Sequence, residues 1–259
     1  IAGAAVVVGR RGGMVVARGY GSSGRGDSVR PVSATGTLFD LASLTKVVAT
    51  TTAVALLVEA GELELDDPVR QHLPEFRGEE RDEIRIHHLL THTSGLPSGL
   101  WLFGSARSAE EALAEVLEAP IRRKPGERVQ YSDLGMILLG AVVERIAGAP
   151  LDVFLAERVF TPLGMDATMF LPPLALREMI VPAAEITERD FPLQGIVHDA
   201  NAFRLEGIAG HAGLFSTARD LAVFAQMMLN GGSYGPVRIL SPETVATFTR
   251  PRSEADDRA

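Results

Sequence analysis

The first apolar positions of the chain fall into two short runs that a glycine-rich turn separates. Residues Ala4 to Val8 and Met14 to Ala17 are mostly Val and Ala, and Gly9-Arg10-Arg11-Gly12-Gly13 lies between them. Runs of this length around a glycine-rich turn are typical of an antiparallel hairpin. Because a lone two-stranded hairpin is at best marginally stable in water, we expect it to join a larger sheet. The remaining sequence supplies no clear further strands.

Further along the chain, apolar residues recur at helical spacing. Gly61 ends the first long apolar run, and the turn Pro125-Gly126 precedes the second. A polar turn and a short extended connection are expected from Gly61 to Pro74, and prolines break the pattern into loops between Pro172 and Asn201. The expected helices cover residues 43–60, 86–91, 108–118, 132–147, 151–160, 218–229 and 242–249.

Composition and charge narrow the class of protein. Apolar residues make up 46% of the 259 residues and charged residues 22%, the balance of a globular protein of one large domain or two interleaved ones. The formal net charge of −8 disfavours nucleic-acid partners and anionic membrane surfaces, which attract basic patches. No stretch approaches the roughly 20 consecutive apolar residues of a membrane span.

The chain contains no cysteine, which excludes disulfides, thiolate chemistry and cysteine-based metal sites. This does not decide the compartment. The sequence begins at Ile1 without an initiator Met, so a periplasmic or secreted location is compatible with removal of a leader. Localisation and oligomeric state stay open.

The candidate chemistry begins with Ser43 and Lys46 at the start of the first long apolar helix. Lys46 and Lys124 are the only lysines, since every other cationic side chain is Arg. Residues three apart share a helix face, so the Lys46 amine can reach the Ser43 hydroxyl. A neutral lysine can act as the base that activates a serine, and burial and the helix dipole both disfavour the ammonium form. The competing interpretation is an N-cap serine followed by a lysine that reaches solvent.

Tyr131-Ser132-Asp133 opens the second apolar helix. A tyrosine in this position often only packs against the core. Its phenol could instead relay a proton between Ser43, Lys46 and the leaving group, which is a general acid–base role.

These segments together resemble the motifs of serine β-lactamases of the class C type and of penicillin-binding proteins, in the branch that includes penicillin-binding protein 4B and related esterases. The blocks that carry the resemblance occur in the family's order and cover the chain nearly end to end: Ser43-Leu44-Thr45-Lys46 within 39–46, Thr91-His92-Thr93-Ser94-Gly95 within 89–97, Tyr131-Ser132-Asp133 within 125–133, and His211-Ala212-Gly213 within 197–217. The resemblance implies an α+β fold of the β-lactamase/transpeptidase type, with a helical region beside an antiparallel sheet.

The same resemblance implies acyl-enzyme chemistry on an ester, amide or lactam carbonyl, with Ser43, Lys46 and Tyr131 as catalytic residues. The oxyanion donors would be the Ser43 N–H and one N–H from a strand that this sequence lacks. No metal or organic cofactor is implied, and the substrate would be a small molecule or a peptidoglycan-like compound. His88 and His92 have the spacing of a zinc half-site, but no third ligand is evident.

Two positions depart from the family pattern. Asp133 stands where the family usually has Asn; a carboxylate only accepts hydrogen bonds, and near Lys46 it favours the ammonium form. We therefore expect it to disfavour lactam hydrolysis more than ester hydrolysis. His211-Ala212-Gly213 imitates the family's third motif, but it leads directly into the helix from Leu221, as a block preceding that motif does. His211 and Asp133 are the candidate substrate-binding residues. The true third motif is expected beyond Ala259.

The expected organisation has three parts. Residues 1–36 form the hairpin and loop of the sheet region, 37–240 the helix-rich catalytic region, and 241–259 the start of a C-terminal segment that returns to the sheet. The chain looks cut at both ends. The alternative function, which Asp133 and the missing third motif favour, is a non-catalytic binding module of the penicillin-binding-protein type or an inactive fragment.

Overall fold

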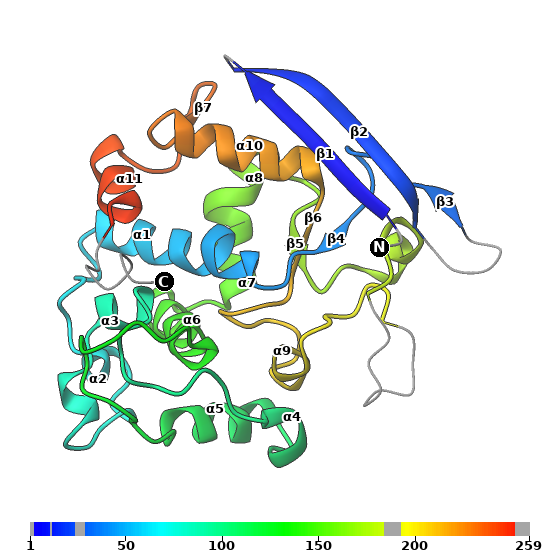
Figure 1. Cartoon of the computed structure of the whole chain (residues 1–259). Coiled ribbons are helices and arrows are strands. Elements are labelled where there is room, and N and C mark those ends of the chain that lie inside the picture. Colours follow the sequence, from blue (N-terminus) through cyan, green and yellow to red (C-terminus); the bar gives the residue numbers. More distant parts are fainter. Residues whose placement is uncertain (1–2, 11, 24–28, 184–192, 252–259) are drawn as a thin grey trace.

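The computed structural model describes residues 3–10, 12–23, 29–183 and 193–251 of the chain. Helices surround the central helix α6, and a long hairpin runs along one side of them (Figure 1). The helices are η2 Lys46–Thr51, α1 Thr52–Glu59, α2 Val69–His72, η3 Arg81–Glu83, α3 Ile86–Leu90, α4 Leu102–Ser105, α5 Ala109–Leu117, α6 Asp133–Ala147, α7 Leu151–Leu155, η4 Ala156–Phe160, α8 Thr161–Leu163, η5 Leu174–Met179, α9 Ala200–Arg204, α10 Ala218–Leu229 and α11 Pro242–Thr249. The strands are β1 Gly3–Arg10, β2 Gly13–Ser23, β3 Arg30–Pro31, β4 Phe39–Asp40, β5 Met169–Phe170, β6 Leu214–Ser216, β7 Ser233–Tyr234 and β8 Val237–Arg238.

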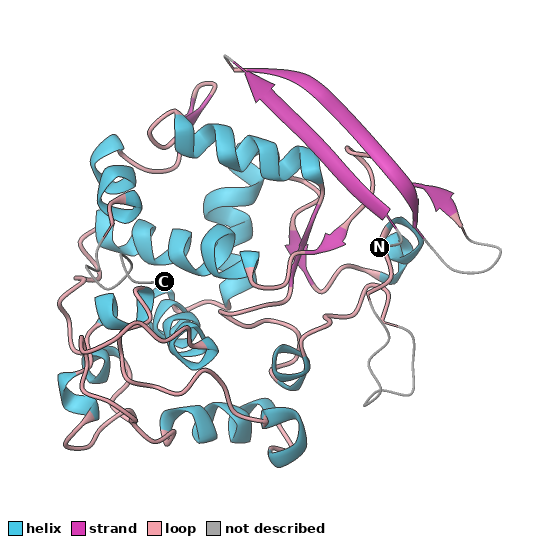
Figure 2. Ribbon diagram, viewed as in Figure 1, coloured by secondary structure: helices cyan, strands magenta, loops and turns pink. Residues whose placement is uncertain are grey.

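The predicted hairpin is confirmed, and its strands are longer than the apolar runs indicated. β1 pairs with β2 antiparallel, and the register shifts between Val8 and Gly9. β3 adds a short third strand to the free edge of β2. Helix α10 packs against β1, as Figure 2 shows, so one face of that strand is partly covered. The hairpin is thus part of a three-stranded sheet, as expected because an isolated two-stranded hairpin is only marginally stable.

A second antiparallel sheet, of order β4-β6-β5, was not predicted. Its strands have only two or three residues each, too few for an alternating pattern to stand out in sequence. The central strand β6 is fully buried, and its Leu214 carbonyl accepts the Leu41 N–H at 2.9 Å. This sheet therefore fixes the chain two residues before Ser43.

Most predicted helices are confirmed, and side-chain caps explain where they start. Ser108, Ser132, Thr217 and Ser241 each accept a backbone N–H of the helix that follows. Gly148 ends α6 in the left-handed conformation. The expected extended connection after Gly61 instead contains α2, a helix of four residues that is too short to show a 3.6-residue period.

The predicted helix 43–60 is present but irregular. Ser43 lies in a turn and residues 44–45 are α-helical. Lys46–Thr51 then wind as a π-helix, and Thr52–Glu59 are α-helical before Gly61 adopts φ 71°. π-Helical turns of this kind occur frequently at functional sites. Here the wide turn begins at Lys46 itself.

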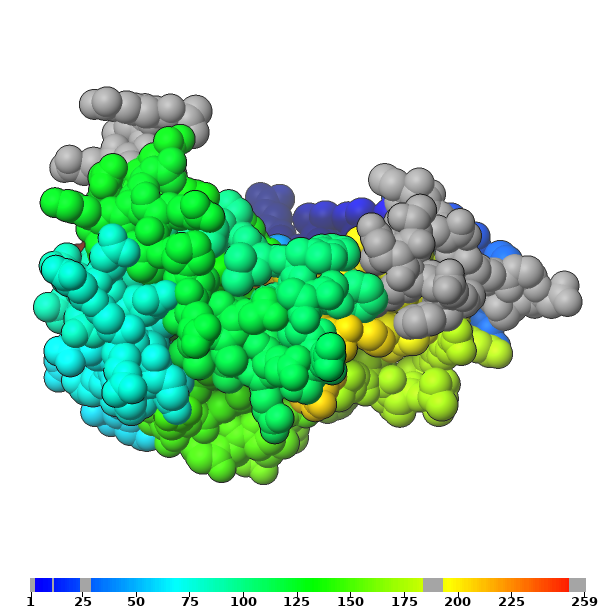
Figure 3. All heavy atoms as spheres, turned by 90° about the horizontal axis from the view of Figure 1, so that it is seen from below, coloured from blue at the N-terminus to red at the C-terminus, as the bar shows by residue number. Residues whose placement is uncertain are grey.

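The main core surrounds α6. Leu134, Leu138, Leu139, Val142 and Val143 of this helix are completely buried, and α6 packs against α3, α5, α7, α1 and η2. Seen from below in Figure 3, this face of the molecule is covered by the cyan to green middle of the chain. The apolar faces that the helical periodicity indicated are therefore the ones that pack together.

Helices with separate antiparallel sheets make this an α+β fold, as predicted. The division at residues 36 and 240 stays a prediction, and residues 252–259 of its last part lie outside the described residues. Within the described part of the chain, no single helix is long and apolar enough to cross a membrane, and one bent pair, Asp133–Ala147 with Leu151–Leu163, passes that test by length and composition only.

Candidate active site

The turn that presents Ser43 is held by Asp40. The Asp40 carboxylate accepts the Ala42 N–H at 2.8 Å and the His198 N–H at 2.7 Å. Burial raises the pKa of Asp40, against these two hydrogen bonds. Ala42 lies in the left-handed region at φ 46°, which is strained for a residue with a side chain. Ser43 follows, exposed to solvent, in the first turn of the helix, where the N–H groups of residues 44–46 donate back to the carbonyls of residues 41–43.

Lys46 lies beneath Ser43 with its side chain only 6% exposed. Its Nζ donates to Ser43 Oγ at 3.0 Å and to the His211 carbonyl at 3.0 Å, and it lies 2.7 Å from Asp133 Oδ1. Two hydrogen-bond acceptors and one ion-paired carboxylate therefore surround this amine. Burial was expected to place this amine in apolar surroundings. The methylene groups of Lys46 are buried, but its Nζ is surrounded by polar groups.

Tyr131 completes the cluster. The Lys46 Nζ lies 4.7 Å from the centre of the Tyr131 ring, and the ring itself is 49% exposed. Asp133, two residues later, has its side chain 28% exposed. The structure therefore brings together Ser43, Lys46, Tyr131 and Asp133, four of the five predicted site residues.

A loop of residues 92–98 holds the segment that carries Tyr131. The Gln130 N–H donates to the His92 carbonyl at 2.8 Å, and the Asp133 N–H donates to the Ser98 carbonyl at 2.8 Å. The Ser132 hydroxyl donates to the Pro97 carbonyl at 2.7 Å. The segment that carries the tyrosine is thus tied to a much earlier part of the chain, which sequence spacing alone does not indicate.

His211 joins the cluster through its backbone, and its role in substrate binding stays a prediction. Its side chain is 1% exposed, and Nε2 lies 2.9 Å from Asp199 Oδ1. Although burial opposes it, the hydrogen bond and charge of His211 hold the pKa of Asp199 at about 2. The imidazole is thus held by Asp199, while the His211 backbone carbonyl contacts the cluster through Lys46.

The sequence did not indicate the contacts of three groups near the site: the Asp40 carboxylate, the carbonyl of residue 211, and the His92 side chain. A backbone carbonyl carries no residue signature, so no sequence pattern could have identified it. His92 was considered only as a zinc ligand. No group of three or more His, Cys, Asp or Glu side chains placed to hold a metal ion occurs among residues 3–10, 12–23, 29–183 and 193–251.

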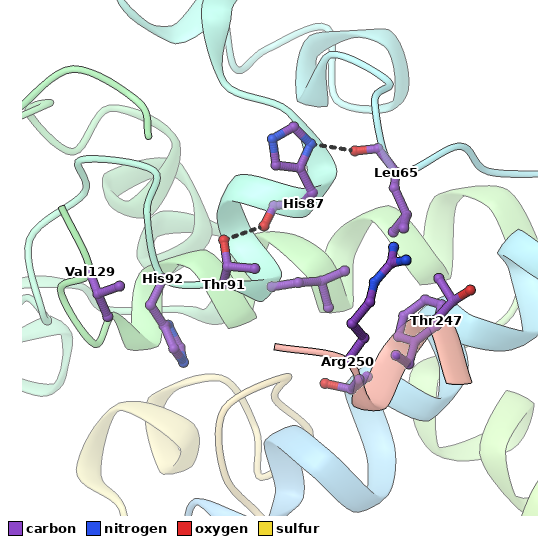
Figure 4. A pocket seen from close by; sticks show the side chains of 10 residues that line it. Leu65, His87, Thr91, His92, Val129, Thr247 and Arg250 are labelled. Carbon is purple, nitrogen blue, oxygen red and sulfur yellow. Dashed lines mark hydrogen bonds between the residues drawn. The ribbon is translucent and has the colours of Figure 1, made fainter. Parts of the chain in front are cut away.

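A pocket of about 380 Å³ lies close to this cluster but does not include Ser43 or Lys46. Figure 4 shows its lining, with His87 and Thr91 on one side, Thr247 and Arg250 on the other, and His92 at one end. We therefore define the candidate site by Ser43 and Lys46 themselves and not by this pocket. His92 is shared, because it lines the pocket and also contacts Tyr131.

Comparisons with known proteins show the family to which the chain is similar. The family model described as Beta-lactamase matches residues 1–259. The chain is 38% identical over 253 residues to "Putative D-alanyl-D-alanine carboxypeptidase" of Escherichia coli (strain K12), covering 87% of this chain and 58% of that protein. It is 34% identical over 284 residues to N-acetylmuramyl-L-alanine amidase of Bacillus subtilis (strain 168), covering 96% of this chain and 64% of that protein. The chain therefore spans about three fifths of the length of these curated relatives.

Among solved structures, the fold is similar to that of EstCE1, described as a hydrolase with promiscuous acyltransferase activity. The TM-score is 0.76 at 27% sequence identity, and the match covers 95% of this chain and 71% of that one.

Proposed function

This chain belongs to the β-lactamase family, and from that premise we propose that it is a serine hydrolase that forms an acyl-enzyme on Ser43. The observation that carries the proposal is the 3.0 Å contact between Lys46 Nζ and the hydroxyl of an exposed serine. A serine becomes an effective nucleophile when an adjacent base takes its proton. Nucleophile and base lie within the hydrogen-bond distance that such a transfer needs.

The reaction follows from these positions. Ser43 Oγ attacks the substrate carbonyl carbon, while its proton passes to Lys46 in the neutral-amine form. The Ser43 N–H at the helix start donates to the oxyanion. The leaving amine or alkoxide takes a proton back through Lys46 and Tyr131, and the C–N or C–O bond breaks. Water then attacks the acyl-serine, and the acid product leaves with Ser43 restored.

For the substrate, we propose a carbonyl compound related to peptidoglycan, such as a D-alanyl peptide or a short ester. The names of the relatives, a carboxypeptidase and an amidase, support the first class. The hydrolase EstCE1 supports the broader class of acyl donors. Asp133 in place of an amide favours esters over lactams, because a carboxylate cannot donate to a lactam carbonyl.

One observation favours a second candidate, a binding module that does not turn over. The Asp133 carboxylate lies 2.7 Å from Lys46 Nζ as an ion-pair partner, and an ammonium group held in such a pair cannot take a proton. A single experiment separates the two candidates.

The experiment combines covalent labelling with turnover. A fluorophosphonate probe followed by peptide mass mapping is expected to label Ser43, and Ser43→Ala is expected to abolish both labelling and hydrolysis of a nitrophenyl ester. Lys46→Arg keeps the charge but supplies no base, so turnover is expected to fall at least about a hundredfold. The matched control is Ser22→Ala on β2, a serine outside the reactive cluster, which should leave labelling and turnover unchanged.

Three results would contradict the serine hydrolase. Label on another serine would remove Ser43 as the nucleophile. Turnover of Lys46→Arg within a few-fold of the parent would make the lysine structural. A parent that accepts label on Ser43 but hydrolyses no ester, D-alanyl peptide or lactam would support the binding module.

A further inference from the structure

His92 is attached to both neighbours of the tyrosine in the candidate site. Its carbonyl accepts the Gln130 N–H at 2.8 Å, and its Nδ1 accepts the Ser132 N–H at 3.2 Å. Between these two hydrogen bonds, the imidazole packs on the Tyr131 ring, with 4.6 Å between ring centres and 41° between ring planes. One histidine therefore holds Tyr131 at three points: before it, after it and on its ring.

The backbone of His92 is itself unusual. At φ 57° it lies in the left-handed region, which non-glycine residues seldom adopt. This conformation turns its carbonyl and its ring toward the same segment, 130–132. A packing role needs neither the strained backbone nor an acceptor at Nδ1.

The hydrogen bond from the Ser132 N–H requires one protonation state of the His92 ring. Nδ1 can accept the Ser132 N–H only in a neutral ring with its proton on Nε2, because an imidazolium has no free lone pair. Burial, together with the positive charge of Lys46, lowers the pKa of His92, while Asp133 opposes this shift. His87 of α3 and Arg250, which follows α11, line the same pocket as His92 (Figure 4).

We propose that His92 is a positioning residue that, as a neutral imidazole, holds the Tyr131 ring beside Lys46. This rests on the proposed function, in which Tyr131 relays a proton. His92 does not touch the reacting atoms; it acts through the residues on either side of the tyrosine. Protonation of Nδ1 breaks the Ser132 contact and releases one of the three points that hold the ring.

Substitutions at position 92 separate positioning from folding. His92→Asn keeps an acceptor, Oδ1, at the same number of bonds from the backbone as Nδ1, and Asn tolerates the left-handed conformation. His92→Gly also fits that backbone but removes both the acceptor and the ring. His87→Ala is the matched control, because His87 lies in α3 and contacts the Leu65 carbonyl rather than Tyr131.

Steady-state kinetics with a nitrophenyl ester give the first readout. His92→Gly is expected to lower kcat at least about tenfold with KM within about twofold, because the proposed role of His92 is to position Tyr131 rather than to bind substrate. His92→Asn should recover kcat to within about threefold of the parent, and His87→Ala should match the parent. Equal kcat for His92→Gly and the parent, or no recovery by a folded His92→Asn, would overturn the proposal.

The pH profile gives a second readout. In the parent, kcat should fall on the acid side as His92 becomes protonated, below the ordinary histidine range because its pKa is lowered. The charged groups Lys46 and Asp133 act on the same ring and are unchanged in His92→Asn. The Asn variant should therefore lose one acid-side step and keep the rest. Identical profiles for the two proteins contradict the proposal.

A third readout does not depend on activity. Nitrogen-15 NMR of labelled histidine rings, with His92→Asn to assign the signal, should show His92 neutral near pH 7 with its proton on Nε2. A proton on Nδ1 at neutral pH would refute the Ser132 contact even if the parent hydrolyses no substrate in the panel. An inactive parent with the expected tautomer would instead count against the hydrolase, and it would remove the relay that His92 is proposed to support.

Discussion

At the scale of single residues, the sequence revealed the serine–lysine pair but not what surrounds it. Ser43 and Lys46 are three positions apart, so one helical turn brings them to 3.0 Å without help from the rest of the fold. Asp133 and Tyr131 come from a distant part of the chain, and only the family resemblance placed them at the site. The His211 carbonyl and the ring of His92 had no such signal. Only the structure shows the polar groups that surround Lys46 Nζ.

Asp133 is expected to select substrates through its carboxylate. Asp133→Asn replaces the ion pair with Lys46 by a neutral contact and provides an N–H₂ donor for a lactam carbonyl. The ratio of cephalosporin to nitrophenyl-ester hydrolysis should rise about five- to tenfold, as one net hydrogen bond of about 1 kcal/mol implies. Initial rates with a chromogenic cephalosporin and a nitrophenyl ester measure this ratio.

Asp166→Asn, at an exposed position after α8, is the matched control and should leave the ratio unchanged. A parent that already prefers the cephalosporin would refute this role of the carboxylate.

At the scale of elements, the long helices could be predicted from the sequence and the short strands could not. The long helices α6 and α10 combine helical periodicity with Ser or Thr caps, so their positions followed from sequence. Strands β4, β5 and β6 have two or three residues, and their pairing joins positions near 40, 170 and 215. No local pattern contains such information, because the register exists only once the chain has folded.

Helix α3 is expected to make the protein less stable in acid. The His88 Nδ1 accepts the Arg85 N–H at 3.1 Å at the start of this helix. Burial, with the charges of His87 and Arg85, lowers the pKa of His88 to about 4. The unfolded chain, with a pKa near 6.5, therefore binds more protons between these values, and stability is lost as pH falls from about 6.5 to 4.

His88→Asn keeps an acceptor but does not titrate, so it should remove this part of the pH dependence. Because the ring is only partly buried, solvent screening reduces the expected contribution to on the order of 2 kcal/mol. Urea unfolding of the parent and of His88→Asn between about pH 4 and 7 gives the difference directly. His92 contributes a loss of the same sign in both proteins, and it therefore cancels. Parallel stability curves for the two proteins would show that His88 is not protonated on unfolding.

At the scale of the whole molecule, one buried segment joins the helices to the reactive cluster. Residues 210–214 run between α6 and η2, and the Gly210 carbonyl accepts the Thr50 hydroxyl at 2.7 Å. The next carbonyl, of residue 211, accepts Lys46 Nζ, and the Leu214 N–H donates to Thr45 Oγ1 at 3.2 Å. The resemblance identified this block as a motif. Its role as a buried support follows only from the packing of elements distant in sequence.

Gly210 is expected to be essential to this arrangement. A Cβ at this position would lie 2.0 Å from the Met136 carbonyl oxygen and 3.2 Å from the Gly140 N, both in the backbone of α6, which cannot move aside as a side chain could. Gly210→Ala should therefore push the segment away from α6, with a loss of about 3 kcal/mol or more in the free energy of unfolding. The residue-211 carbonyl would move with it, so ester turnover should fall as well.

Gly36→Ala is the control, because its Cβ would meet only the Ser33 side chain, at 3.6 Å, and its φ lies outside the left-handed range. Unfolding midpoints and ester turnover of the two variants, measured beside the parent, test the argument together. If Gly210→Ala unfolds like the parent, α6 and the segment are not in close contact in solution. If it is destabilised yet retains full turnover wherever it is folded, the contact supports the fold but the carbonyl does not position Lys46. The expected result, a loss of both, ties the chemistry of Ser43 to the packing of the whole chain.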